Sequence, residues 1–175
     1  AERGGVGERA AILLELKLLA DIGIVGKPNA GKSTLLGLYT RARPKVADYP
    51  FTTVEPIMGV VATHDSNFVI MEIPGLLEGA HRGVGLGHEF LRHSERSRII
   101  LHMIDGLADD PLADLQDIRN ELRQFNPLLL DKPFVVAVNK IDIPEVHARL
   151  DILKREFSSL EKDIFPVSAA TGEGT

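Results

Sequence analysis

The chain has 175 residues, of which 44% are hydrophobic and 26% charged, and its formal net charge is −5 at pH 7. This length suits one globular domain with a proper core. The negative net charge argues against a protein that coats nucleic acid through bulk electrostatics, although it leaves room for a local basic patch. The absence of cysteine excludes disulfides and thiolate chemistry and suits a reducing, cytoplasmic location. No apolar run approaches the length of a membrane span, and no signal peptide is visible.

Short apolar runs rich in branched residues alternate with helix-length segments along the chain. Runs of this kind, apolar on both faces, are typical of a mostly parallel sheet that is covered on both sides. Strands are predicted at 22–25, 58–62, 68–73, 99–104, 134–138 and 164–167. The second and third are expected to form a hairpin through the polar residues 64–67.

Four helices are predicted between these strands. The clearest covers 109–125, where Asp110 can cap the helix and Pro111 suits its first turn. The others are expected from near Lys32 through Leu38, over 87–97 and over about 146–160. The sequence therefore predicts a doubly wound α/β domain with a mostly parallel six-stranded sheet and helices on both faces. Ligands are expected at the carboxyl ends of its strands.

The loop after the first strand matches the phosphate-loop pattern G-x-x-x-x-G-K-[ST] in full. Its residues are Gly26, Lys27, Pro28, Asn29, Ala30, Gly31, Lys32 and Ser33. Its glycines let successive N–H groups point at an anion, and the following helix N-terminus adds a favourable dipole. Lys32 would reach the terminal phosphates and Ser33 would ligate Mg²⁺. A chance glycine turn is disfavoured because strand, loop, Lys-Ser pair and helix are all in register. The fold is thus predicted to be that of a P-loop NTPase.

A second motif, after the strand 134–138, indicates which base is bound. Its residues are Asn139, Lys140, Ile141 and Asp142. The Asp142 carboxylate can accept from both N1–H and the exocyclic amine of guanine, whereas adenine offers an acceptor and no amine there. Asn139 would tie this loop to the phosphate loop, and the Lys140 stem would cover a base face. By itself, this tetrapeptide is more often a solvated turn.

Three more loops fit a GTPase domain. The residues that end the strand 68–73 occupy the D-x-x-G position, whose acid holds a Mg²⁺-bound water and whose glycine N–H contacts the γ-phosphate. They are Glu72, Ile73, Pro74 and Gly75. A plain strand ending in a Pro-Gly turn is the alternative. Either Thr52 or Thr53 can close over Mg²⁺ and the γ-phosphate. The last loop can donate a backbone N–H to guanine O6. Its residues are Ser168, Ala169 and Ala170.

Longer segments around and between these motifs closely resemble the Obg family of GTPases. They are residues 14–21, 48–53, 74–80 and 85–96, and the last two are specific to that family. The resemblance implies Mg²⁺ ligation by Ser33 and Thr53, with catalytic roles for Lys32, Thr53, Gly75 and Asn29. It also implies a first switch that consists of Phe51, Thr52, Thr53, Val54 and Glu55. Glu72 departs from the aspartate that is usual in the family, and it keeps the outer-shell Mg²⁺ role.

The resemblance also predicts a domain division. Residues 1–17 would be the end of a glycine-rich N-terminal domain with its linker. Residues 18–175 would be the GTP-binding domain, truncated before its last helix.

Hydrolysis is expected to be slow without help. Many GTPases have a glutamine directly after the glycine of the second switch, and this chain has Leu76. Asn29 resembles the residue that holds K⁺ against the phosphates in potassium-activated relatives, which makes K⁺ a hypothetical second cofactor.

The expected function is that of a slow Mg²⁺-dependent, GTP-hydrolysing switch in large ribosomal subunit assembly and in growth or stress control. The alternative is a sensor whose partner binding follows occupancy by GTP, GDP or guanosine tetraphosphate. We expect a cytoplasmic monomer whose partner is rRNA or a ribosomal protein. Four arginines near the second switch are either a solvated face or a nucleotide-gated contact to that partner. They are Arg82, Arg92, Arg96 and Arg98.

Overall fold

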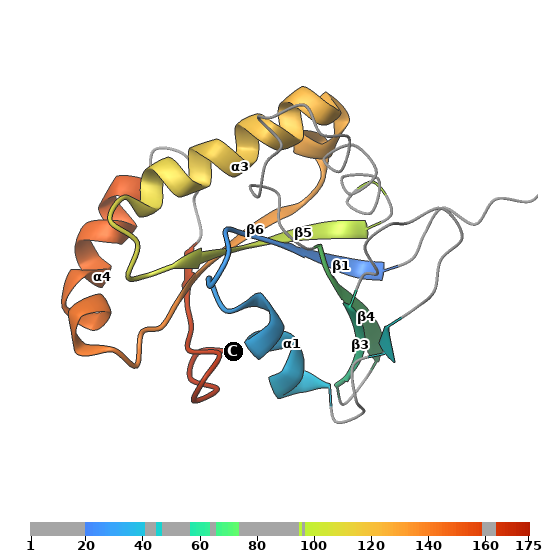
Figure 1. Ribbon diagram of the computed structural model, residues 1–175, viewed down its shortest axis with the longest axis horizontal. Helices are drawn as coiled ribbons and strands as arrows, with labels where there is room; N and C mark the ends of the chain where they lie inside the picture. The colour runs from blue at the N-terminus through green and yellow to red at the C-terminus, as the bar shows by residue number, and fades with distance from the viewer. Residues whose placement is uncertain are drawn as a thin grey trace, which may run out of the picture.

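The computed structural model describes residues 20–40, 45–46, 57–63, 66–73, 95, 97–158 and 164–175. This part of the chain forms a seven-stranded sheet in the order β2-β3-β4-β1-β5-β6-β7 (Figure 1). The strands are β1 (Ala20–Val25), β2 (Lys45–Val46), β3 (Ile57–Ala62), β4 (Asn67–Glu72), β5 (Ser97–Asp105), β6 (Phe134–Asn139) and β7 (Ile164–Pro166). The helices are α1 (Lys32–Tyr39), α3 (Pro111–Phe125), α4 (Pro144–Phe157) and the short 3₁₀ helix η2 (Pro127–Asp131).

Strand direction brings the functional loops to one edge of the sheet. The strands β4, β1, β5, β6 and β7 run parallel to one another, and β3 is antiparallel to both β2 and β4. The carboxyl ends of the five parallel strands therefore meet at the same edge. Ligand sites of doubly wound sheets lie at that edge.

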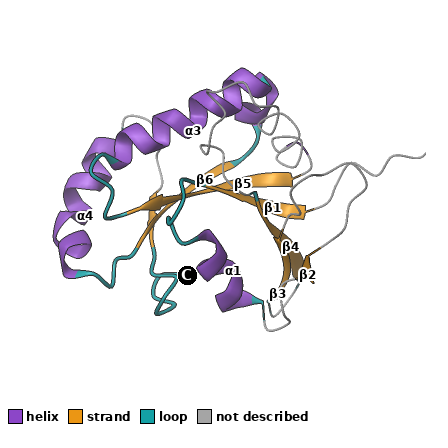
Figure 2. Ribbon diagram, viewed as in Figure 1, coloured by secondary structure: helices purple, strands orange, loops and turns teal. Residues whose placement is uncertain are grey.

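Helices cover opposite faces of the sheet (Figure 2), and a separate apolar cluster lies under the helices on each face. Alternate residues of one strand face opposite sides, so Ile24 packs with Leu36 of α1 while Val25 packs with Ile118 of α3. A third cluster joins α4 to α3 and the sheet through Phe157, which is fully buried. Each helix that carries or borders a loop of the site is therefore fixed to the sheet by its own buried face.

The predicted fold class is confirmed. All six predicted strands are present within about two residues, and the β3–β4 hairpin is antiparallel as expected. The two-residue strand β2 was not predicted, because two residues carry no periodicity. Helix α3 starts at Pro111 and not at residue 109, since the Asp110 carboxylate caps it by accepting from the N–H of Ala113 at 2.9 Å.

Two other boundaries differ from the prediction. Helix α4 begins two residues early, with Pro144 in its first turn, and ends at Phe157. The helix predicted over 87–97 falls outside the described residues except for Glu95 and Ser97, and Ser97 belongs to β5. None of the helices in the described ranges is long and apolar enough to cross a membrane.

Candidate functional site

The loop between β1 and α1 has the backbone of a phosphate cradle. Gly26, Asn29 and Gly31 have positive φ angles of 155°, 63° and 100°. A Cβ at Gly31 would also collide with the side-chain amide of Asn139, so close packing requires glycine there. Helix α1 begins at Lys32, and its N-cap makes no side-chain capping hydrogen bond. The N–H groups of the first turn can therefore serve an anion, which the helix dipole also favours.

The Lys32 ammonium lies inside this cradle. Its Nζ donates to the carbonyl oxygens of Gly26 at 3.1 Å and Lys27 at 3.0 Å, and only 6% of the residue is exposed. Burial lowers the pKa of Lys32, and the negative charge of Glu72 partly opposes that shift. A buried cation close to available N–H groups gives the loop the positive field that a polyphosphate needs.

Glu72 ends β4 beside Ile24 of β1 and is 7% exposed. Its Oε2 is buried and has no hydrogen-bond partner within the part of the chain that the structure describes. An oxygen of this kind is costly unless something pairs with it. The next residue, Ile73, is fully buried and donates its N–H to the Ile24 carbonyl at 2.9 Å, which fixes the exit of β4 against β1.

Asn139 connects three loops of the site. Its Nδ2 donates to the Ala30 carbonyl in the phosphate loop at 2.7 Å, and its Oδ1 accepts from the N–H of Ala169 at 2.8 Å. The residue is 3% exposed, so both bonds are shielded from water. The hydrogen bond that the sequence predicted between this loop and the phosphate loop is therefore present.

The loop after β6 is braced on two sides. Lys140 has a φ of 72°, and its Nζ pairs with Asp105 Oδ2 at 2.5 Å. The Ser168 hydroxyl, in the loop after β7, donates to Asp142 Oδ1 at 2.6 Å, so this loop is joined to the carboxylate that is predicted to bind guanine. Asp142 is exposed, and Ile141 is buried under the loop with its N–H bonded to the Val167 carbonyl at 3.3 Å.

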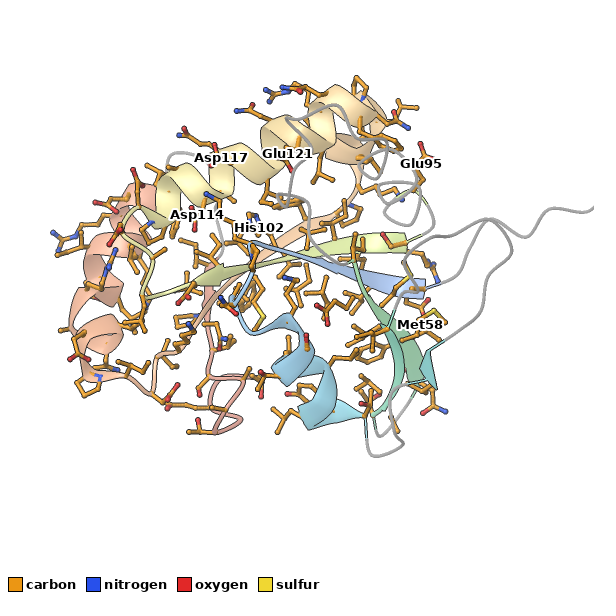
Figure 3. All side chains as sticks on the ribbon, in the orientation of Figure 1. Met58, Glu95, His102, Asp114, Asp117 and Glu121 are labelled. Carbon is orange, nitrogen blue, oxygen red and sulfur yellow. The ribbon has the colours of Figure 1, made fainter. Side chains whose placement is uncertain are left out.

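The phosphate loop is also attached to α3. Lys27 Nζ lies 2.5 Å from Asp114 Oδ1 and 2.9 Å from Asp117 Oδ2. Both carboxylates belong to α3 (Figure 3). Burial acts to lower the pKa of Lys27, but the hydrogen bonds and charges of the two carboxylates outweigh it and the pKa is raised. The sequence alone did not predict Asp105 or the two partners of Lys27. The spacing of Asp114 and Asp117, three residues apart on one helix face, is a signal for a shared partner, but it does not say which residue that partner is.

Several predicted site residues lie outside the described ranges. In the first switch these are Phe51, Thr52, Thr53, Val54 and Glu55, and in the second they are Pro74 and Gly75, followed by Leu76. Within the basic cluster, Arg82, Arg92 and Arg96 are likewise outside. Arg98 is described: its side chain is 68% exposed, and Nη1 lies 3.7 Å from Asp21 Oδ1.

His102 of β5 lies under α3 (Figure 3). Its ring is buried against the edge of Phe134, with centroids 5.9 Å apart. Desolvation, with smaller contributions from Arg119, Lys32 and Lys27, lowers the pKa of His102 to about 3. Across the described residues no group of three His, Asp or Glu side chains is placed to hold a metal ion.

A phosphate loop after β1 and an N-K-x-D loop after β6, joined through Asn139, define the class of P-loop GTPase domains. Solved structures agree. Era in complex with MgGDPNP and a fragment of 16S ribosomal RNA superimposes with a TM-score of 0.66 at 27% identity, over 90% of this chain and 53% of that one. A variant of Era from Aquifex aeolicus, bound to GDP.AlF4⁻, gives a TM-score of 0.63 at 28% identity, over 87% of this chain and 52% of that one.

Sequence comparison narrows the class. The model of the 50S ribosome-binding GTPase family matches residues 21–140. The chain therefore belongs to this family, and the predicted resemblance to Obg GTPases is confirmed. It is 54% identical to GTPase Obg of Roseiflexus castenholzii, over 99% of this chain and 40% of that protein. It is 51% identical to GTPase Obg of Anaeromyxobacter sp., over 99% of this chain and 51% of that protein. The chain thus spans about half or less of these relatives' length.

Proposed function

We propose that this chain is the nucleotide-binding domain of a slow, Mg²⁺-dependent GTP-hydrolysing switch. It would act on the large ribosomal subunit during assembly and in growth or stress control, as a cytoplasmic monomer. The observation that carries the proposal is the pair of Asn139 hydrogen bonds, to Ala30 at 2.7 Å and from Ala169 at 2.8 Å. They hold the phosphate loop and the base loops at a fixed separation, as one nucleotide spanning both would require.

Each end of this site has its own chemistry. The N–H groups of the phosphate loop and the Lys32 ammonium would hold the β- and γ-phosphates. At the other end Asp142, oriented by the Ser168 hydroxyl at 2.6 Å, would accept the N1–H and amine of guanine. A base without those donors leaves the carboxylate unpaired, which disfavours adenine nucleotides strongly.

The residues present fit Mg²⁺. Glu72 offers a buried oxygen that has no partner in the described residues, and Ser33 is exposed in the first turn of α1. Ser33 and Thr53 would ligate the ion directly, and Glu72 would accept from one of its waters. Bound Mg²⁺ supplies charge neutralisation to the phosphate oxygens. The extra methylene of Glu72 shifts its carboxylate relative to an aspartate, so Mg²⁺ affinity and hydrolysis rate are the properties it would alter.

Slow hydrolysis follows from Leu76, which cannot orient water. The residues that would act on the γ-phosphate are Lys32, Thr53, Gly75 and Asn29. Asn29 is exposed in the loop with a φ of 63°, and we propose that its side chain holds K⁺ beside the phosphates.

In the longer protein, residues 1–17 would end a glycine-rich domain, and residues 18–175 would precede a last helix.

The second candidate function is a sensor of GTP, GDP or guanosine tetraphosphate. Two features of this sequence favour it: Glu72 at the acidic position and Leu76 in place of a glutamine both point to weak hydrolysis. In that case partner binding follows occupancy, and turnover is incidental.

GTP turnover separates the two functions. The full-length protein is assayed with Mg²⁺, alone and with purified large ribosomal subunits, beside Ser33→Ala, which removes the proposed Mg²⁺ ligand. A switch hydrolyses slowly alone and is accelerated by the subunits, and the variant loses both rates. Tight diphosphate binding without any acceleration would overturn the switch and support the sensor. Replacing KCl by NaCl in the same assay tests Asn29, and equal rates would remove K⁺ from the proposal.

A further inference from the structure

Asp105 and Lys140 meet at the carboxyl edge of the sheet. Asp105 ends β5 opposite Asn139 in the parallel register of β5 and β6, so it lies next to the residue that precedes Lys140. Lys140 Nζ bonds to Asp105 Oδ2 at 2.5 Å, and the two side chains are only 27% and 18% exposed. The left-handed backbone of Lys140, with φ of 72°, is uncommon for a residue with a side chain. The ion pair with Asp105 thus coincides with an uncommon backbone conformation at Lys140.

Asp105 is itself held in place. Its other carboxylate oxygen, Oδ1, accepts from the N–H of Leu107 at 2.9 Å, and its carbonyl accepts from Ala108 at 3.1 Å. Arg149 of α4 braces the same turn by donating to the Ala108 carbonyl at 3.2 Å. A Cβ at Gly106 would meet Val146 and the Asn139 carbonyl, so the turn has no room to shift toward α4 or β6. The carboxylate that bonds Lys140 is thus a fixed point.

We propose that Asp105 is a positioning residue for base binding: it holds the Lys140 stem in the pose that covers one face of the guanine. This inference rests on the proposed GTP site. A free lysine side chain is flexible and strongly hydrated, and it loses rotamer freedom when it packs on a ligand. Because Asp105 fixes the ammonium before the nucleotide arrives, that loss is incurred in folding and not in binding.

An ion pair that positions Lys140 and an ordinary surface ion pair should affect nucleotide affinity differently. A plain surface pair would leave nucleotide affinity unchanged. A positioning pair acts on the base and not on the γ-phosphate, so it changes nucleotide affinity and leaves the rate of hydrolysis at saturating GTP nearly as it was. It also acts only through Lys140, so its effect vanishes once the Lys140 ammonium is gone.

The test uses three variants of the full-length protein. Asp105→Asn keeps an acceptor for the Leu107 N–H but loses the ion pair. Lys140→Met keeps an apolar stem without charge, and the double variant combines both. Asp109→Asn is the matched control, because Asp109 is exposed in the same loop and has no side-chain bond within the described part of the chain. Affinity for GDP is measured with a fluorescent guanine nucleotide, together with kcat, KM and the melting temperature.

Asp105→Asn should weaken GDP binding by about three- to tenfold, the range expected for a bond to a charged group that acts indirectly. KM should rise while kcat stays within about twofold, and Asp109→Asn should match the wild type. In the Lys140→Met background, Asp105→Asn should add no further loss. Wild-type affinity in Asp105→Asn would overturn the inference, and so would an equal loss with and without Lys140. If the wild type binds no guanine nucleotide, the proposed function itself fails, which is a different result.

Discussion

Asn139 shows how much one side chain can fix in this site. Its amide has one donor and one acceptor end in use, and each reaches a different loop of the sheet edge. Hydrophobic truncation would leave the Ala30 carbonyl and the Ala169 N–H unpaired in the interior. An unsatisfied buried group costs about 1–3 kcal/mol. Asn139 therefore joins the phosphate loop to the loop after β7 through two hydrogen bonds that are shielded from water.

The buried ring of His102 makes the stability of the fold depend on pH. Its pKa in the folded chain is about 3, below the usual 6.5, because burial excludes the charged ring. Below pH 6.5 the ring binds a proton in the unfolded chain but not in the folded chain. The free energy of unfolding is therefore not reduced by His102 well above pH 6.5, and it falls progressively as the pH drops from 6.5 toward about 3. Lowering the pH from 6.5 to 5 therefore reduces the free energy of unfolding by about 2 kcal/mol at most through this group.

Replacing His102 by leucine should therefore flatten the pH dependence of unfolding. Neither ring nitrogen has a partner among the described residues, so the change removes no visible hydrogen bond. Urea unfolding at pH 7 and pH 5 measures the difference. The wild type should lose about 1–2 kcal/mol more than His102→Leu between these two values. An identical loss in both proteins would assign the acid sensitivity to other groups.

At the scale of elements, ion pairs attach the phosphate loop to α3. Lys27 lies between Asp114, whose side chain is 15% exposed, and Asp117, which is 52% exposed. Exposure weakens an ion pair through solvent screening, so the bond to Asp114 should carry most of the stabilisation. The raised pKa of Lys27 agrees with a net stabilising contact.

Lys27→Met should thus destabilise the domain more than Asp117→Asn. We expect about 1 kcal/mol for Lys27→Met at low salt, because it leaves the half-buried Asp114 unpaired, and about 0–0.5 kcal/mol for Asp117→Asn. The first value should fall in 1 M NaCl, where charges are screened over a few ångströms. Chemical denaturation at two salt concentrations is the measurement. A larger loss in Asp117→Asn would show that the exposed carboxylate is the main partner.

The same elements show which features a sequence can predict. The strands are predictable because each is a short apolar run, and the site loops because their residue types are rare in that order. Asp105 and Asp114 escape prediction, since each acts through a residue far away in the chain: Lys140 lies 35 positions after Asp105, and Lys27 precedes Asp114 by nearly ninety. Contacts of that kind depend on strand order and helix placement. Only the folded sheet brings their members together.

At the scale of the whole molecule, nucleotide binding should stabilise the domain as one unit. The site draws on loops after β1, β6 and β7, and the apolar layers beneath these strands are continuous with α1, α3 and α4. A ligand that binds only the folded state adds about 2.7 kcal/mol at a concentration of one hundred times its Kd. For a domain of this size, that corresponds to a rise of about 5–10 °C in melting temperature.

A comparison of GDP with ADP shows how much of the rise in melting temperature depends on the base. GDP should raise the melting temperature in a single transition, whereas ADP, which presents the same phosphates to the same loop, should raise it by far less. The difference tests Asp142 directly, because Asp142→Asn should remove most of the GDP shift while the melting temperature of the free protein stays close to that of the wild type. An ADP shift as large as that of GDP would mean that the phosphate loop alone dominates binding. The loop after β6 would then brace the fold without selecting the base, and the hydrogen bond from Ser168 to Asp142 would be structural.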